Sequence, residues 1–361
     1  MKMNEFYKNK KVFITGNTGF KGSWLTQTLI RFGAQVVGYS IEIPPEPSLF
    51  KILKLDTKIK TYFEDIRNYP KLNSAIETEK PDIIFHLAAQ PIVRRSYDEP
   101  LFTIETNTLG TANLLCSLRN CSSVKSVVMI TTDKVYKDQD FVWPYREVDQ
   151  LGGYDPYSCS KACAELIINS FRNSYFNTKD YGESHNILIA SARAGNVVGG
   201  GDWSEDRLIP DIARTLVSNK ELVIRSPKAI RPWQFVLEPL SGYLVLAKKL
   251  FEEDTRCASP WNFAPVDTNF VDVETVVKYA IQYLKKGSYS IKEDSNKHET
   301  HILKLDSSKA KDLLGWRPQL SKDETFQWTF EWYERFYKNA NNINELTFMQ
   351  IDSYFKRCDY E

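Results

Sequence analysis

The sequence is poor in residues that bind metals or form disulfides. It contains four histidines and six cysteines, and no two cysteines form a C-x-x-C pair. A structural zinc site needs clustered Cys and His ligands, so none is expected. Reduced thiols in a cytoplasmic protein are the simplest account of the scattered cysteines.

Long apolar runs and an excess of one charge are also missing. The longest apolar runs, such as residues 127–130 and 187–190, have the length of strands and cannot span a bilayer. Residues 1–10 lack the apolar core of a signal peptide. With 47 basic and 46 acidic side chains, the net charge is +1. This balance gives no general attraction to nucleic acid or membrane, so the expected partner is a small molecule.

What the sequence does contain is an alternation of strands and helices. Residues 11–15 form a short apolar run that leads directly into glycines, as a buried parallel strand does. The alternation continues with strands at 35–39, 82–86, 126–131 and 186–192, and with helices at 20–32, 101–118 and 158–175. This order is typical of an α/β protein with a doubly wound parallel sheet, the Rossmann arrangement.

Beyond about residue 193 the pattern becomes irregular and rich in Gly, Pro and Trp. We expect residues 1–185 to form a Rossmann domain and residues 186–361 to form a smaller C-terminal lobe that closes over a substrate. Residues 235–251 look helical and are expected to pack back on the first domain. The two parts are therefore predicted to be interleaved and not arranged in series.

A glycine-rich loop joins the first strand to the first helix. It has the pattern G-x-x-G-x-x-G and consists of Gly16, Asn17, Thr18, Gly19, Phe20, Lys21 and Gly22. Such glycines allow a tight turn and a close approach of the backbone to a pyrophosphate. The helix N-terminus adds N–H donors and a partial positive charge. The loop therefore predicts a dinucleotide cofactor.

The following residues leave the choice between NAD and NADP open. An acidic residue after the second strand would select NAD, but that strand ends at Ser40 and the nearest acid is Glu42. Lys21 could accommodate a 2′-phosphate. Asp65, which precedes Ile66 after the third strand, is a candidate partner for the adenine amino group, with a helix N-cap as the equal alternative.

Two polar groups of residues predict proton transfer. Tyr157 and Lys161 are four residues apart near a helix start, so they share one face. A nearby ammonium should lower the pKa of the tyrosine toward that of a useful base. Thr131 to Lys134 follow a strand, and the carboxyl ends of parallel strands face the ligand crevice. A solvated Tyr–Lys pair and a helix-capping Asp133 are the alternatives.

Together these motifs resemble the extended short-chain dehydrogenase/reductase superfamily, and within it the 4,6-dehydratases that act on CDP-glucose. The resemblance covers roughly residues 9–318. It is carried by the glycine loop, H-L-A-A-Q at 86–90, N-T-L-G-T at 107–111, T-D-K at 132–134, Y-S-C-S-K at 157–161, R-A-G-N-V-V-G-G-G-D-W at 193–203 and R-P-W-Q at 231–234. Related dTDP- and GDP-sugar dehydratases resemble one another in carrying Thr-Asp-Glu, so the T-D-K triplet is the more specific signal.

The resemblance implies NAD as cofactor and CDP-glucose as substrate. Tyr157 would take the proton of the glucose 4-hydroxyl, and Asp133 would protonate the C6 oxygen that leaves as water. The product would be CDP-4-keto-6-deoxyglucose. The base that removes the C5 proton is left open between Lys134 and another group, because a free lysine has a pKa of about 10.4.

The candidate site residues fall into three sets. The catalytic set is Thr132, Asp133, Lys134, Tyr157 and Lys161. The cofactor contacts are the glycine loop (Gly16 to Gly22), Ser40, Asp65, Ile66, Leu87, Ala88, Ala89, Gln90, Asn107, Thr131, Tyr157 and Lys161. The substrate contacts are Gln90, Arg95, Thr132, Arg193, Asn196, Leu208, Arg231 and Trp233.

Within the substrate set, Arg231 is the best candidate for the diphosphate, because a guanidinium binds phosphate oxygens as a fork. A structural ion pair is the alternative for Arg193. Loop anchoring is the alternative for Gln90 and Arg95, and a place in the core is the alternative for Leu208 and Trp233.

Three other functions compete with dehydration. A sugar-nucleotide 4-epimerase would need Tyr157 and Lys161, but not the Asp133–Lys134 pair. A non-catalytic dinucleotide sensor would need none of these, and a simple carbonyl reductase would not need the long second lobe. The helices at 101–118 and 158–175 resemble those of a four-helix dimer interface, so a homodimer or a dimer of dimers is expected.

Overall fold

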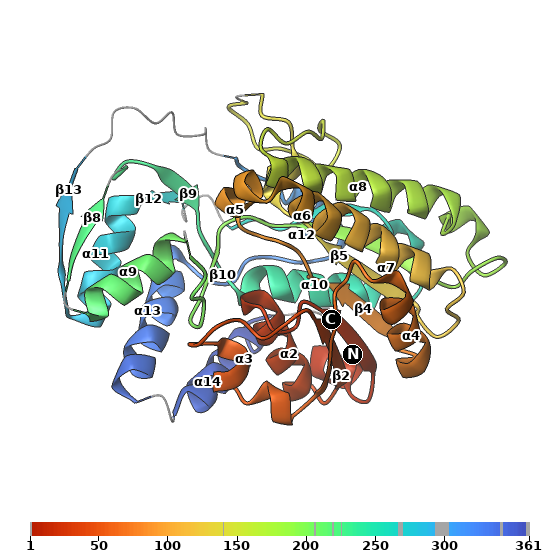
Figure 1. Ribbon diagram of the computed structural model, residues 1–361, viewed down its shortest axis with the longest axis horizontal. Helices are drawn as coiled ribbons and strands as arrows, with labels where there is room; N and C mark the ends of the chain where they lie inside the picture. The colour runs from red at the N-terminus through yellow and green to blue at the C-terminus, as the bar shows by residue number, and fades with distance from the viewer. Residues whose placement is uncertain are drawn as a thin grey trace.

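The computed structural model describes residues 2–139, 141–205, 207–218, 220–224, 226–265, 270–292, 303–339 and 342–358. Its centre is a seven-stranded sheet with the strand order β11-β6-β5-β4-β1-β2-β3 (Figure 1). All neighbouring pairs in it are parallel, which confirms the predicted doubly wound sheet. The strands are β1 (Lys11–Thr15), β2 (Gln35–Ser40), β3 (Lys60–Phe63), β4 (Ile83–His86), β5 (Ser126–Ile130), β6 (Leu188–Arg193) and β11 (Pro260–Asn262).

Both faces of this sheet are covered by a hydrophobic core. Successive side chains of a strand point to opposite faces, so each strand contributes to both cores. In β5, Val128 and Ile130 belong to one core cluster, whereas Val127 and Met129 belong to the other. This is why the central strands β4 and β5 are apolar at nearly every position. Helices α2 and α10 contribute to the first cluster, and α4, α7 and α8 contribute to the second. Their bounds are α2 (Phe20–Arg31), α4 (Tyr69–Glu79), α7 (Gly110–Leu118), α8 (Pro156–Ser174) and α10 (Leu237–Phe251).

The predicted helix over residues 101–118 is three consecutive elements. It begins with α6 (Pro100–Ile104), continues as the π-helical stretch η2 (Glu105–Leu109) and ends as α7. A π-helical stretch inside an α-helix is often found at a functional site. Here it carries Asn107, one of the expected cofactor contacts.

The boundary that we placed at residue 185 cuts the central sheet. Strands β6 and β11 both follow that position and pair with each other and with β5. Helix α10 packs against β5 and β6, as we expected for residues 235–251. The first unit therefore draws on residues from both sides of the predicted boundary.

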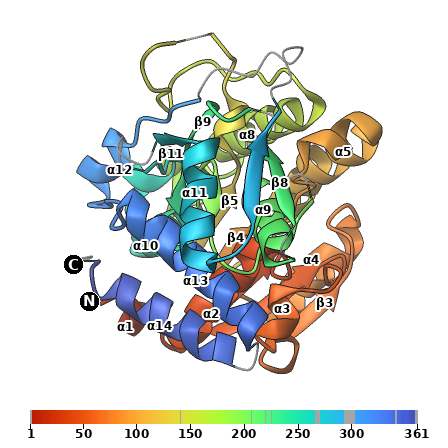
Figure 2. The same ribbon diagram turned by 90° about the vertical axis from the view of Figure 1, so that its left-hand side faces the viewer.

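The second lobe lies at one end of the molecule and consists of small sheets and helices (Figures 1 and 2). Its two-stranded sheets pair β7 with β10, β9 with β12, and β8 with β13. The bounds are β7 (Val197–Val198), β8 (Glu221–Ile224), β9 (Ile230–Pro232), β10 (Gln234–Phe235), β12 (Phe270–Asp272), β13 (Ser288–Ile291), α9 (Leu208–Val217), α11 (Val273–Leu284) and α13 (Lys322–Lys338).

After α13 the chain returns to the first unit. Helix α14 (Ile343–Phe355) packs on α2, and Asp352 binds the guanidinium of Arg31 at 2.8 and 2.9 Å. The remaining short helices are α1 (Met3–Tyr7), α3 (Leu49–Ile52), η1 (Leu55–Thr57), α5 (Val93–Asp98), η3 (Asp133–Val135), η4 (Thr178–Asp180), η5 (Thr255–Cys257) and α12 (Ser308–Leu313). Within the described ranges, no helix has both the length and the apolar character needed to cross a bilayer.

A buried carboxylate anchors the C-terminal segment to α10. Glu238 accepts hydrogen bonds from the backbone N–H groups of Gln319 (2.9 Å) and Leu320 (2.7 Å), and from the hydroxyl of Tyr354 (2.6 Å). Burial raises the pKa of Glu238 to about 7, because a charged carboxylate loses its hydration inside the protein. The folded protein therefore keeps a proton that the unfolded chain releases at lower pH.

Replacing Glu238 with Gln should remove a pH dependence of stability. Because the folded-state pKa lies above the ordinary 4.5, this group favours folding most at low pH. That contribution is lost as the pH rises from about 5 to about 8. We expect the free energy of unfolding of the wild type, measured by urea titration, to fall relative to that of Glu238→Gln over this interval. The exposed Glu345→Gln is the control, and equal slopes for wild type and Glu238→Gln would contradict the prediction.

Candidate active site

The glycine loop makes the tight turn that the sequence predicts. Gly16 has a φ of +74°, and its N–H donates to the carbonyl of Tyr39 at 2.8 Å. A Cβ on Gly22 would lie 2.0 Å from the carbonyl oxygen of Gly16. A larger residue at position 22 would therefore separate the helix from the loop. This close approach leaves the N-terminus of α2 facing the end of β1, where a pyrophosphate can be bound.

Several polar side chains of the loop bind other parts of the protein. The Asn17 amide donates to the Thr61 hydroxyl at 3.1 Å and accepts from the Ser40 hydroxyl at 2.8 Å. The Thr18 hydroxyl donates to the carbonyl of Glu42 at 2.7 Å. These bonds fix the loop on β3 and on the end of β2. Contacts from Asn17, Thr18 and Ser40 to a cofactor stay predictions.

Asp65 lies after β3 and is bound to Arg67. Its carboxylate accepts from the backbone N–H, Nε and Nη2 of Arg67 at 2.7 to 2.9 Å. These bonds hold the pKa of Asp65 below its usual range, against the effect of burial. The N-cap of α4 is Asn68 and not Asp65. The alternative that we kept for Asp65 is thus taken by another residue, and its adenine contact stays a prediction.

The segment after β4 packs directly on the glycine loop. A Cβ on Gly16 would lie 2.7 Å from the backbone nitrogen of Ala88 and 2.8 Å from the carbonyl carbon of Leu87. Asn107 connects this segment to α8, because its amide donates to the carbonyl of Gln90 at 3.1 Å and to the Ser160 hydroxyl at 2.9 Å. Leu87 to Gln90 and Asn107 therefore surround the same corner as the glycines, and contacts to a cofactor, Ala89 included, stay predictions.

Two predicted substrate contacts in this region have their side chains bound elsewhere. The buried Gln90 amide donates to the Thr103 hydroxyl at 2.8 Å and accepts from the N–H of Ile92 at 2.6 Å. This anchoring argues against a substrate contact by the Gln90 side chain. Arg95 forms an exposed pair with Glu99 at 3.0 Å and is not fixed toward any site.

Four of the predicted catalytic residues are buried together. Thr132 and Asp133 follow β5, and Tyr157 and Lys161 lie in the first turns of α8, where Asp155 caps the helix. The Thr132 hydroxyl donates to Asp133 at 2.8 Å, and its interaction with Tyr157 acts to lower the pKa of that phenol. The structure therefore brings a hydroxyl, an acid, a phenol and an amine to one edge of the sheet.

The fifth, Lys134, is half-buried in the short helix η3. Its backbone N–H donates to the Thr132 hydroxyl at 3.4 Å. A role as the base at C5 stays a prediction.

Burial dominates the electrostatics of this cluster. It raises the pKa of Tyr157 to about 12, and the charge of Asp133 acts in the same direction while that of Arg207 opposes it. Burial also lowers the pKa of Lys161 to about 7, with help from Lys21. The pKa of Tyr157 is therefore not lowered in the chain by itself, contrary to our expectation, because desolvation outweighs the charges around the phenol.

Two cations of this site have roles that the sequence did not indicate. Burial and the charge of Arg207 lower the pKa of Lys21 to about 8 while the charge of Asp133 opposes them, so Lys21 lies within the range of these two charges. This placement does not support the 2′-phosphate contact considered for Lys21. Arg207 pairs with Asp202 at 2.8 Å and acts on Tyr157. Its position directly before Leu208, a predicted substrate contact, was the available signal.

Arg193 lies beneath the cluster in a buried ion pair. Its Nε and Nη2 donate to Glu165 at 3.0 and 2.8 Å, and its Nη1 donates to the Tyr136 hydroxyl at 2.7 Å. All three nitrogens are used inside the protein. The structural alternative therefore describes Arg193, and this argues against the predicted substrate contact. Glu165 follows Lys161 by four residues, a helical spacing that could have indicated it.

The remaining predicted substrate contacts are spread over the second lobe. Arg231 lies half-buried in β9, and Leu208 starts α9. Asn196 adopts a left-handed φ of +39° at the end of the segment after β6. Trp233 is buried, donates to the carbonyl of Val271 at 3.3 Å and packs on aromatic rings of the core, which argues against a contact to the base.

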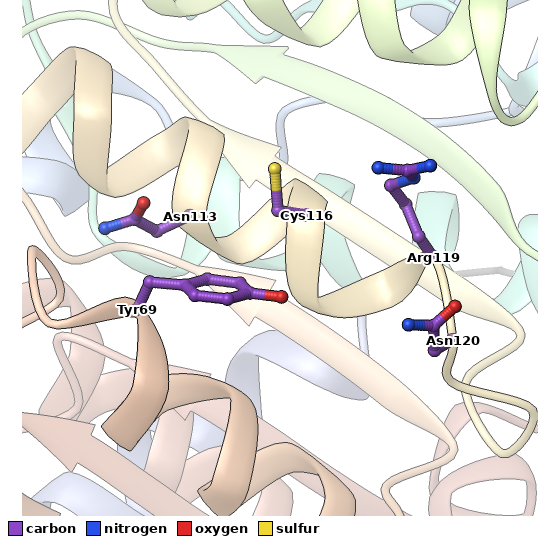
Figure 3. A pocket seen from close by; sticks show the side chains of 5 residues that line it. All are labelled: Tyr69, Asn113, Cys116, Arg119 and Asn120. Carbon is purple, nitrogen blue, oxygen red and sulfur yellow. The ribbon is translucent and has the colours of Figure 1, made fainter.

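A hollow of about 500 Å³ lies elsewhere, between α4 and α7, and is lined by Tyr69, Asn113, Cys116, Arg119 and Asn120 (Figure 3). None of the predicted site residues lines it. The candidate active site is therefore the cluster around Tyr157 and not this hollow.

Proteins of known activity are similar to this chain over most of its length. CDP-glucose 4,6-dehydratase of Salmonella typhimurium is 47% identical over 339 residues, which is 94% of each chain. The human dTDP-D-glucose 4,6-dehydratase is 25% identical over 350 residues, 93% of each chain.

Solved structures show the same fold. The dTDP-glucose 4,6-dehydratase of Streptomyces venezuelae has a TM-score of 0.76 at 21% identity, covering 93% of this chain and 99% of its own. An epimerase of Methanothermobacter thermautotrophicus has a TM-score of 0.78 at 23% identity, covering 94% and 97%. The family model described as GDP-mannose 4,6 dehydratase matches residues 13–329. The chain therefore belongs to the GDP-mannose 4,6-dehydratase family.

Proposed function

We propose that the protein is a CDP-D-glucose 4,6-dehydratase that uses NAD in an internal redox cycle. The observation that carries this proposal is the buried cluster of Thr132, Asp133, Tyr157 and Lys161 at the carboxyl edge of the sheet. The 47% identity to a CDP-glucose 4,6-dehydratase over 94% of the chain supports the cytidine nucleotide. The product is CDP-4-keto-6-deoxyglucose, and one water is released.

The residues of the glycine loop fit a dinucleotide. A Cβ at Gly22 would occupy the space beside Gly16, so the loop and the start of α2 form a narrow cradle of backbone N–H groups. The dehydratase of Streptomyces venezuelae was solved with NAD bound. When bound here, NAD would accept hydride from C4 of the glucose and return it to C6.

The chain supplies the proton transfers. Tyr157 takes the proton of the 4-hydroxyl as C4 is oxidised, and the resulting ketone acidifies the C5 hydrogen. A base, Lys134 or another group, removes the C5 proton while the C6–O bond breaks. Asp133, which is a carboxylate while C4 is oxidised, then takes up a proton and gives it to the leaving oxygen, which departs as water. An epimerase would not need this acid, so the buried Asp133 beside Tyr157 favours a dehydratase.

The proposed diphosphate contact and the proposed oligomeric state depend on residues outside the cluster. Arg231 is the proposed contact for the diphosphate. Apolar side chains stand exposed on α6, η2 and α8, namely Leu101, Ile104, Leu109 and Leu166. They support a homodimer, or a dimer of dimers, through these helices. A cytoplasmic place for the enzyme rests on its scattered, unbridged cysteines.

The nucleotide preference is tested by a direct comparison of substrates. The protein is incubated with CDP-, dTDP-, UDP- and GDP-glucose, and the product is analysed by mass spectrometry for the loss of one water. We expect CDP-glucose to be dehydrated much faster than the other three. Equal turnover of dTDP-glucose would contradict the cytidine assignment, and conversion between glucose and galactose forms without water loss would indicate an epimerase.

The pH profile of the first hydride transfer should report on Tyr157. Because the charge of Asp133 raises the pKa of Tyr157 and that of Arg207 opposes the rise, the variants Asp133→Asn and Arg207→Gln should move the profile in opposite directions. Asp133→Asn should form bound NADH at lower pH than the wild type, and Arg207→Gln only at higher pH. The control Tyr157→Phe should slow this step by about 10²–10⁴-fold. Shifts in the same direction, or a fully active Tyr157→Phe, would contradict the role of Tyr157.

Deuterium placed at C4 of the substrate should not exchange with solvent hydrogen during the reaction. If one NAD serves both hydride transfers, deuterium placed at C4 reappears at C6 of the product, and solvent hydrogen enters at C5. Asp133→Asn should oxidise C4 and then stop before water leaves, so that bound NADH accumulates. Loss of deuterium to the solvent, or a need for added NADH, would show an ordinary dehydrogenase or reductase.

A further inference from the structure

Gly195 lies directly against the carboxylate of Asp133. A Cβ at position 195 would be 2.0 Å from Oδ2, 2.4 Å from Cγ and 3.0 Å from Oδ1 of Asp133. The first two distances are shorter than those that real Cβ atoms essentially ever show. The Asp133 carboxylate therefore occupies the space that a side chain at position 195 would fill.

The backbone itself does not require glycine at this position. Among the residues that the structure describes, seven glycines have a positive φ, Gly16 and Gly201 among them, but Gly195 is not one of these. An alanine could therefore adopt the same backbone conformation. Glycine at position 195 is explained by the neighbouring carboxylate and not by a turn.

The backbone around Gly195 is hydrogen-bonded on two sides, so it cannot easily move away from the Asp133 carboxylate. The side-chain amide of Gln234 donates to the carbonyl of Gly195 at 2.9 Å, and its backbone N–H donates to the carbonyl of Asn196 at 3.2 Å. The N–H of Phe263 donates to the carbonyl of Arg193 at 2.9 Å. A methyl group at position 195 would thus be accommodated by movement of the Asp133 side chain.

The opposite side of the carboxylate is fixed by Thr132. The Thr132 hydroxyl donates to Oδ1 of Asp133 at 2.8 Å, while Oδ2 faces Gly195. Asp133 is buried, so no shell of water provides alternative partners of equal quality. A rotation away from Gly195 would break the bond to Thr132 and turn the acid away from the cluster around Tyr157.

We propose that Gly195 is a positioning residue for Asp133, which it holds where the acid can protonate the leaving C6 oxygen. This inference rests on the proposed dehydratase function and assigns to Gly195 one step of it, the loss of water. The preceding oxidation at C4 uses Tyr157 and Lys161, whereas the three atoms nearest to a Cβ at position 195 all belong to Asp133. With Gly195 in place the dehydration can be completed, whereas without it the reaction should stop at the 4-ketone.

The test is Gly195→Ala with CDP-glucose, with two readouts on the same sample. Absorbance of bound NADH in a single turnover measures the oxidation at C4, and mass spectrometry measures the loss of water. We expect oxidation to stay within about threefold of the wild type while dehydration falls by about 10²-fold, the range of a lost general acid. Bound NADH should accumulate. An equal loss in both steps, or normal dehydration, would overturn the proposal.

The matched variants are Asp133→Ala and the double variant. If Gly195 acts only through the carboxylate, then Gly195→Ala should slow dehydration little further once Asp133 is alanine. Any fall in melting temperature caused by Gly195→Ala should also be relieved in the double variant, so this measurement decides the matter even if the single variant folds poorly. Additive losses in rate or in melting temperature would overturn the proposal. Failure of the wild type to dehydrate any of the four nucleotides would instead reject the proposed function.

Discussion

The buried pair of Glu165 and Arg193 is the interaction on which the site depends. Glu165 belongs to α8 and Arg193 to the end of β6, and their side chains are 3% and 2% exposed. Glu165 also accepts from the hydroxyls of Thr131 at 2.5 Å and Ser191 at 2.8 Å. One carboxylate therefore fixes the ends of two central strands and the helix that carries Tyr157 and Lys161.

Such a pair costs several kcal/mol per ion to desolvate, and it is stable only when its donors and acceptors are satisfied. Here every guanidinium nitrogen has a partner, because Tyr136 and the carbonyl of Glu147 accept from Nη1. Glu165 also opposes the fall in the pKa of Lys161. The same carboxylate thus influences both the position of α8, which carries Lys161, and the pKa of the Lys161 amine.

Local patterns predicted the fold well, whereas the directions of individual side chains could not be predicted. The glycine loop, the strands and α8 have signals within a few residues, such as the apolar run before Gly16 and the spacing of Tyr157 and Lys161. The directions of Gln90 and Arg193 depend on residues far away in the sequence or on another element, such as Thr103 and Glu165. A sequence pattern shows that a polar residue is present, but not which partner it will have.

The extent of the first unit could not be predicted for a related reason. An irregular stretch after Arg193 suggested that the first unit had ended, yet the three-residue strand β11 adds to its sheet beside β6. A strand this short has too few residues to show a period of two. Its place is set by pairing with β6, and by the buried Trp261 at its centre.

The return of α14 to α2 has a mechanical consequence. The chain leaves the nucleotide-binding unit, builds the second lobe and then closes on the helix that follows the glycine loop, where Phe355 packs edge-on against Phe32. On the way, Trp332 lies against Gly200 and the Tyr333 hydroxyl donates to the carbonyl of Asp202 at 2.6 Å. Packing and a hydrogen bond thus hold the second lobe in place both where it begins and where it ends. A wide hinge opening would have to break these contacts, so we expect substrate to enter through small movements of the peripheral two-stranded sheets while the body of the molecule stays closed.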